Sequence, residues 1–98
     1  MSYKISFRKR ATKEYLESIA WYKGRSLQAA ENFVVSIQQA LNEIEKQPSR
    51  FRRIYKNFYE VKTKRYPYSI VYFIDDMKKL IIITSVFHQK RNPEKKIY

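Results

Sequence analysis

Two apolar runs separated by a short acidic turn constrain the fold of this chain more than any other feature. Tyr68–Ile74 and Leu80–Phe87 are apolar on nearly both faces, and Asp75–Lys79 lies between them. Strands that are apolar on both faces are typical of positions at the centre of a sheet. The spacing therefore predicts a hairpin of two adjacent central strands, with Ser69 as a single polar interruption.

The N-terminal quarter predicts one strand and one helix. Residues 3–7 alternate between apolar and polar side chains, which is the pattern of a strand with one buried face. Helical spacing of apolar residues begins at Ala11 or Thr12. It ends at Gly24, where we expect the positive φ angle that often terminates a helix.

A longer helix is predicted next, with Ser26 as its N-cap and Pro48 beyond its end. The first and second helices should form an antiparallel hairpin against the sheet. Glu14 and Glu17 lie one turn apart on the first helix, and we interpret them as surface residues rather than as paired catalytic carboxylates. The second helix has an apolar stripe with i, i+3, i+4, i+7 spacing, consisting of Ala30, Phe33, Val34, Ile37, Leu41 and Ile44.

The remaining segments complete the predicted fold. Residues 49–57 are basic and are expected to be irregular, whereas Tyr59–Thr63 alternates like a half-buried strand. The N-terminal strand should pair with a later strand, because an isolated strand is not stable. The prediction is one α+β domain over residues 1–98, in the order β-α-α-β-β-β, with a helical hairpin on one twisted, largely antiparallel sheet.

The charge of the chain is large and unevenly distributed. The formal net charge is +12, from 21 basic and 9 acidic side chains. Residues 1–49 contribute +3 (8 basic, 5 acidic) and residues 50–98 contribute +9 (13 basic, 4 acidic). Such a field attracts anionic partners toward one region of the surface. Nucleic acid, an acidic protein and an anionic membrane surface are the candidates, beside a basic surface that serves only solubility.

Composition argues against several other classes of protein. The chain has no cysteine, which argues against disulfides and thiolate metal sites and fits a cytoplasmic protein. It has one histidine, so we expect no metal site, and no motif points to a cofactor. No apolar run approaches the ~20 residues of a membrane span.

Candidate functional residues lie at the margins of the C-terminal hairpin. His88 would act as a general base or, alternatively, anchor the tail through a hydrogen bond to the backbone. Lys64 and Arg65 precede the first run, and Lys90 and Arg91 follow the second. If these segments are neighbours, their cations form an anion-binding site at one end of the sheet.

Tyr98 and the segment 50–59 carry a further signal. Tyr98 could stack on a base or donate to a phosphate, although chain ends are usually mobile. Within residues 50–59, aromatic and basic side chains are interspersed. This mixture is typical of surfaces that bind single-stranded nucleic acid, and equally of protein interfaces anchored by aromatic residues.

Two motifs give the chain a family resemblance. R-Y-P-Y-S-I-V-Y-F-I at residues 65–74 and I-I-I-T-S-V-F-H-Q-K-R-N-P at residues 81–93 resemble the RelE/ParE superfamily of toxins from type II toxin–antitoxin modules. The aromatic-Pro-Tyr entry and the V-x-H-x-x-R-x-P ending are similar to the ParE-like branch, also called plasmid stabilization proteins. The resemblance covers nearly the whole chain.

The resemblance implies a protein partner. Such toxins are neutralised by an antitoxin whose C-terminal segment wraps the toxin, and an acidic segment would suit a +12 surface. The antitoxin is expected to cover the helical hairpin and part of the sheet. The residues predicted to contact it are Tyr15, Ile19, Tyr22, Phe51, Arg53 and Tyr55.

The resemblance also implies one of two targets. ParE-like members poison DNA gyrase, whereas RelE-like members cut mRNA on the ribosome with basic residues and often a C-terminal tyrosine. If this chain is a nuclease, the implied catalytic residues are Arg65, His88, Arg91 and Tyr98. Ser69 stands where RelE-like nucleases commonly have an arginine, which favours gyrase. A non-toxic, antitoxin-binding remnant is the third reading.

Overall fold

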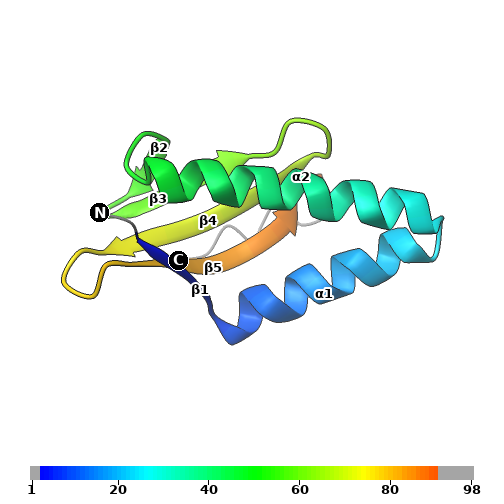
Figure 1. The fold of residues 1–98 in the computed structure, drawn as a ribbon, viewed down its shortest axis with the longest axis horizontal. Coiled ribbons are helices and arrows are strands. Elements are labelled where there is room, and N and C mark those ends of the chain that lie inside the picture. The colour runs from blue at the N-terminus through cyan, green and yellow to red at the C-terminus, as the bar shows by residue number, and fades with distance from the viewer. Residues whose placement is uncertain (1–2, 91–98) are drawn as a thin grey trace.

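The structure is a computed structural model that describes residues 3–90. Two helices pack on one face of a five-stranded sheet, and α2 lies over the strands and runs roughly along them (Figure 1). The elements in chain order are β1 (Lys4–Phe7), α1 (Lys9–Lys23), α2 (Leu27–Lys46), β2 (Arg52–Tyr55), β3 (Phe58–Lys62), β4 (Tyr68–Asp75) and β5 (Leu80–His88).

The sheet has the strand order β1-β5-β4-β3-β2. β1 pairs in parallel with β5, from Lys4 opposite Leu80 to Phe7 opposite Ile83, and every other pair is antiparallel. The predicted α+β class, the central hairpin of β4 and β5 and the pairing of the first strand with a later one are therefore confirmed.

One strand was not expected. Residues 52–55 form β2, so four strands follow the helices instead of three. β2 lies at the sheet edge, and only Ile54 among its four residues is partly buried, so no alternating pattern marks it in the sequence. Lys56, at φ 48°, makes the tight turn into β3, a conformation that the sequence does not signal because glycine usually provides it.

A β-bulge in β5 changes which side chains share a face. Val71 is opposite Ser85 and Tyr72 is opposite Ile83, so Thr84 has no counterpart on β4. The extra residue reverses the alternation of side chains beyond it, so His88 does not share a face with Ile82, as unbroken alternation along the strand would require. His88 instead shares the helix-covered face with Ile83.

The helix ends agree with the sequence in one case and differ in another. Ser26 is the N-cap of α2, and its Oγ accepts a hydrogen bond from the Ala29 N–H at 2.9 Å. Gly24 has φ −66°, so the predicted positive φ is wrong. The chain turns without it because the N–H groups of Arg25 and Ser26 both donate to the Tyr22 carbonyl at 2.9 Å.

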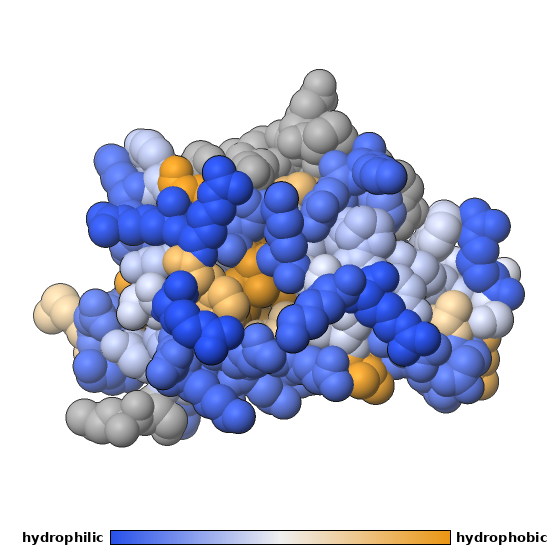
Figure 2. All heavy atoms as spheres, turned by 90° about the horizontal axis from the view of Figure 1, so that it is seen from above, coloured by the Kyte–Doolittle hydropathy of each residue, from blue (hydrophilic) through white to orange (hydrophobic). Residues whose placement is uncertain are grey.

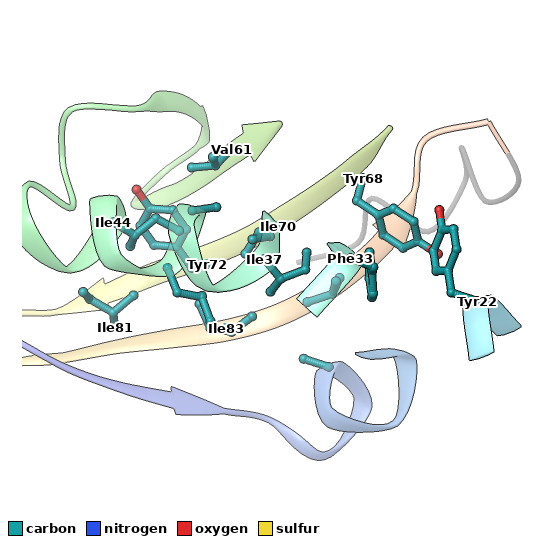
Figure 3. Close-up of a cluster of buried hydrophobic side chains, with 14 of the residues drawn as sticks. Tyr22, Phe33, Ile37, Ile44, Val61, Tyr68, Ile70, Tyr72, Ile81 and Ile83 are labelled. Atoms are coloured by element: carbon teal, nitrogen blue, oxygen red, sulfur yellow. The ribbon is translucent and has the colours of Figure 1, made fainter. Parts of the chain in front are cut away.

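The core lies between α2 and the sheet. The apolar stripe of α2 faces the strands as predicted, and Phe33, Ile37 and Ile44 are fully buried. Figure 3 shows these side chains packed over the residues that β4 and β5 direct toward the helices, among them Ile70, Tyr72, Ile81 and Ile83. Burying a side chain of this size stabilises the fold by roughly 1.5–3 kcal/mol.

Glu14 forms hydrogen bonds with the part of β5 that does not pair with β1. β1 ends opposite Ile83, so the N–H groups of β5 beyond that point lack a strand partner on this side. The Glu14 carboxylate Oε1 accepts hydrogen bonds from the Val86 N–H and the Ser85 Oγ, both at 2.9 Å. The interpretation of Glu14 as a surface residue is therefore wrong, whereas Glu17 is exposed as expected.

Tyr72 ties the centre of the sheet to the end of α2. Its hydroxyl donates to the Pro48 carbonyl, and its ring stacks on Tyr59 at 5.4 Å between ring centroids. Burial, reinforced by the neighbouring Tyr59 phenol, raises the pKa of Tyr72 far above its ordinary value.

This shift predicts an alkaline loss of stability that depends on Tyr72. The Tyr72 phenol has a higher pKa in the folded state than in the unfolded state, so its neutral form favours folding. This contribution is complete below pH ~10, the ordinary pKa of tyrosine, and it is lost as the pH rises further. Tyr72→Phe should lower the free energy of unfolding by about 1 kcal/mol at pH 7, through the lost hydrogen bond. Between pH 10 and 12, urea unfolding should show the wild type losing up to about 1.4 kcal/mol per pH unit more than the variant. If the free energy of unfolding fell equally with pH in the wild type and in Tyr72→Phe, the raised pKa of Tyr72 would be contradicted.

Candidate docking groove and basic sheet end

A groove of about 860 Å³ runs between α2 and the β2–β3 side of the sheet. Viewed from above, apolar residues lie at the centre of this region, with hydrophilic side chains around them (Figure 2). The lining residues come from α2 (Asn32, Val35, Ser36, Gln39, Ala40, Glu43), from the start of the sheet (Arg50, Phe51, Arg52) and from β3 and its following loop (Glu60, Val61, Lys62, Thr63, Lys64, Arg65).

The fold buries only part of the apolar surface of the groove. Val35 is 54% exposed although it belongs to a helix that is otherwise well packed. Ala40 and Val61, which also line the groove, are buried members of the core. The groove therefore has one exposed valine beside a buried apolar floor.

The charges that line the groove are mostly positive. Five of its side chains are basic and two are acidic, a net charge of +3. Arg50 forms an ion pair with Glu43 at 3.6 Å, and its guanidinium lies 4.8 Å from the centroid of the Phe51 ring. The pair is exposed and contributes little to stability. The groove therefore combines an apolar floor with a rim that favours acidic side chains.

The predicted basic segments lie at the same end of the sheet. His88 is paired with Tyr68, and the Gln89 N–H donates to the Pro67 carbonyl at 2.7 Å. Lys90 thus lies in the segment beside the loop that carries Lys64 and Arg65, and all three cations are exposed. Arg91 and Tyr98 lie outside the described residues.

His88 contacts the main chain and an aromatic ring. Its Nδ1 accepts a hydrogen bond from the Lys90 N–H at 3.1 Å, which requires this nitrogen to be unprotonated. Its ring meets Tyr68 edge-on, with centroids 5.2 Å apart. Both contacts are of the kind expected from a histidine that anchors the end of β5.

Ser69 lies on the face of the sheet opposite His88. It is paired with Lys62 and Phe87, whereas the neighbouring Tyr68, which pairs with His88, belongs to the core on the helix side. The Ser69 Oγ is fully buried and has no hydrogen-bond partner among residues 3–90. His88 and the side chain at position 69 therefore do not converge on one site.

Three of the predicted antitoxin contacts face the protein interior. Tyr22 is 8% exposed, and its ring lies 4.9 Å from Phe33. Tyr15 and Ile19 are half-buried and pack against the core. These side chains hold α1 on α2 and the sheet. The large apolar residues that the helical hairpin exposes are Leu16, Trp21, Leu27 and Val35.

The other three predicted contacts lie around β2. Phe51 lines the groove, and Tyr55 is 47% exposed. Arg53 is exposed, and its Nε donates to the Lys56 carbonyl. The groove residues on the outer face of α2 were missed by the sequence analysis. Val35, an apolar residue outside the apolar stripe, is the signal that could have identified them.

Two other site types find no support in the described part of the chain. Residues 3–90 contain no group of three His, Asp or Glu side chains placed to hold a metal ion. None of the helices described is long and apolar enough to cross a membrane.

A comparison with known families identifies the chain. The family model of the ParE toxin of the type II toxin–antitoxin system parDE matches residues 5–93. The chain belongs to this family. The match spans nearly all the sequence of this ParE-family chain, including both motifs that carry the resemblance. No curated relative matches the sequence significantly.

Solved structures of toxins from both branches share the fold. The intact RelBE toxin–antitoxin complex of Escherichia coli is 25% identical, covering 86% of this chain and 93% of the solved chain, with a TM-score of 0.60. The chromosomal ParDE system of Pseudomonas aeruginosa is 12% identical, covering 88% and 95%, with a TM-score of 0.73. The RelBE2 complex of Mycobacterium tuberculosis is 21% identical, covering 90% and 99%, with a TM-score of 0.56. The chain is therefore a RelE/ParE superfamily toxin of type II toxin–antitoxin modules.

Proposed function

We propose that this ParE-family toxin arrests growth in the cytoplasm by poisoning DNA gyrase, and that an antitoxin neutralises it by binding the groove between α2 and β3. Gyrase poisoning by binding requires a recognition surface and no catalytic residues of the toxin's own. The observation that carries the choice of target is Ser69, a buried and uncharged side chain where the nuclease branch commonly has an arginine.

The groove supports the antitoxin part of the proposal. Similar solved structures are toxin–antitoxin complexes, RelBE and RelBE2 among them. A segment with apolar residues on one side and acidic residues on the other would match the exposed Val35, the apolar floor and the net charge of +3. Oppositely charged surfaces also speed the association of two proteins.

The geometry of the basic residues supports gyrase over mRNA. Cleavage of RNA needs cations around the scissile phosphate and a group that moves a proton, all within one site. Arg65 lines the groove, whereas His88 contacts Tyr68 and the Lys90 N–H at the end of β5. These different surroundings of Arg65 and His88 argue against the two residues as a catalytic unit.

A two-armed assay tests the target. Purified protein mixed with gyrase, ATP and supercoiled plasmid should produce linear DNA when the enzyme is denatured, the mark of a stabilised cleavage complex. In a translation reaction, the wild type and Arg65→Gln should both leave the mRNA intact. Unaffected supercoiling together with mRNA cutting that Arg65→Gln abolishes would contradict the gyrase proposal and support the nuclease.

A further inference from the structure

A row of three aromatic rings crosses the sheet on the face that neither helix covers. Tyr55, Phe58 and Phe73 are consecutive cross-strand partners on β2, β3 and β4. Their ring centroids are 6.4 Å apart between Tyr55 and Phe58, and 5.1 Å apart between Phe58 and Phe73. We call these three residues the aromatic row.

A cation lies over the ring at each end of the aromatic row. The Lys56 ammonium nitrogen is 5.3 Å from the centroid of Tyr55, and the Arg8 guanidinium carbon is 5.3 Å from the centroid of Phe73. Both distances are within the ~6 Å at which a cation interacts with a ring face. Arg8 comes from the start of α1, far from the other residues in sequence, so only the fold creates this arrangement.

The row does not belong to the core between the helices and the sheet. The neighbouring residues of the same strands, Tyr59 and Tyr72, fill that core. Tyr55 is 47% exposed, and Phe58 and Phe73 are partly exposed. None of the three rings, and neither flanking cation, lines the groove assigned to the antitoxin.

We propose that the aromatic row is a binding site for single-stranded nucleic acid. Aromatic side chains in a basic surface bind single strands because bases stack on the rings while the cations attract the phosphates. Arg8 and Lys56 place a positive charge at both ends of the row, in a chain of net charge +12. The site is independent of the groove and of the choice between gyrase and mRNA as target.

The chemistry of the row favours a single strand over a duplex. The bases of a single strand are unpaired and can turn their faces toward aromatic side chains, whereas those of a duplex are stacked on one another. The ring centroids, 5.1 and 6.4 Å apart, have the ordinary spacing of cross-strand aromatic pairs. Phe58 and Phe73 have no hydrogen-bonding groups, so the row should tolerate any base sequence and should not distinguish DNA from RNA.

Fluorescence anisotropy with labelled oligonucleotides tests the site. The probes are a 15-nucleotide oligo-dT, an oligo-U of the same length and a 15-base-pair duplex. The wild type should bind both single strands with similar affinity and the duplex more weakly. Tyr55→Leu and Phe73→Leu keep an apolar side chain and remove a stacking surface, so each should weaken single-strand binding about tenfold. Circular dichroism checks that the variants are folded. Tyr55→Leu should disturb the fold less than Phe73→Leu, because Tyr55 is the more exposed residue.

A charge-matched pair of variants separates the row from general electrostatic attraction. Arg8→Gln should weaken binding several-fold more than Lys46→Gln, an exposed cation on α2 that lies outside the row. Equal losses in these two variants, with the ring variants unchanged, would overturn the proposal. So would duplex binding as tight as single-strand binding, binding to RNA alone, or ring variants that lose only the antitoxin.

Discussion

Replacing Glu14 with alanine should lower the free energy of unfolding by about 3 kcal/mol. The substitution removes the acceptor of two buried hydrogen bonds, from the Val86 N–H and the Ser85 Oγ. Each buried donor left without a partner costs about 1–3 kcal/mol. Arg10, which forms an ion pair with Glu14 at 3.4 Å, is exposed enough to be solvated after the change. Urea denaturation followed by circular dichroism measures the loss.

Two further variants separate the hydrogen bonds from the charge and from helix propensity. Glu14→Gln retains an oxygen that can accept both hydrogen bonds, so it should be clearly more stable than Glu14→Ala. Glu17→Ala makes the same chemical change at an exposed position of α1 and should alter stability by less than about 0.5 kcal/mol. Similar losses in Glu14→Ala and Glu17→Ala would show that the hydrogen bonds between Glu14 and β5 do not stabilise the fold.

Replacing Phe33 with alanine should have the largest effect on stability, about 3–5 kcal/mol. Phe33 is fully buried, and its ring contacts Tyr15, Tyr22, Tyr66 and Tyr68 at centroid distances of 4.7–6.0 Å. It therefore joins α1, α2 and the start of β4. For a domain whose total stability is typically 5–15 kcal/mol, this loss approaches unfolding.

The controls for Phe33 test whether the aromatic cluster or only the volume matters. Phe33→Leu keeps most of the apolar volume and should lose distinctly less stability than Phe33→Ala. Val34→Ala, at the next position of α2 but only partly buried, should lose less again. A Phe33→Ala protein that unfolds at the wild-type denaturant concentration would contradict the role assigned to this ring.

The central part of the fold was predictable because its signals are strong and local. Runs such as Tyr68–Ile74 are apolar on both faces, and the stripe of α2 follows helical spacing, so both follow from period and burial alone. β2 was not predictable, since it is a short edge strand with one partly buried residue. The bulge at Thr84 depends on pairing between two strands, which no pattern within one strand reveals.

The site was predictable only where adjacency follows from the hairpin. Pairing of Tyr68 with His88 brings Lys64 and Arg65 to the same end of the sheet as Lys90, as the sequence implied. The groove and the aromatic row depend on how β2 and β3 lie beside α2 and the start of α1. These are tertiary relations between distant segments, and so is the packing of Tyr22 against Phe33, which helical spacing alone does not reveal.

The most direct test of the account is growth after induced expression, with and without the short acidic protein expected to be encoded beside this gene. The toxin alone should arrest growth, and co-expression should restore it. Val35→Asp puts a negative charge into the groove, so this variant should arrest growth and resist rescue. Met77→Asp makes the same addition at a 96% exposed position outside the groove and should still be rescued. Normal growth on expression of the wild type alone, with the protein present and folded, would contradict the account.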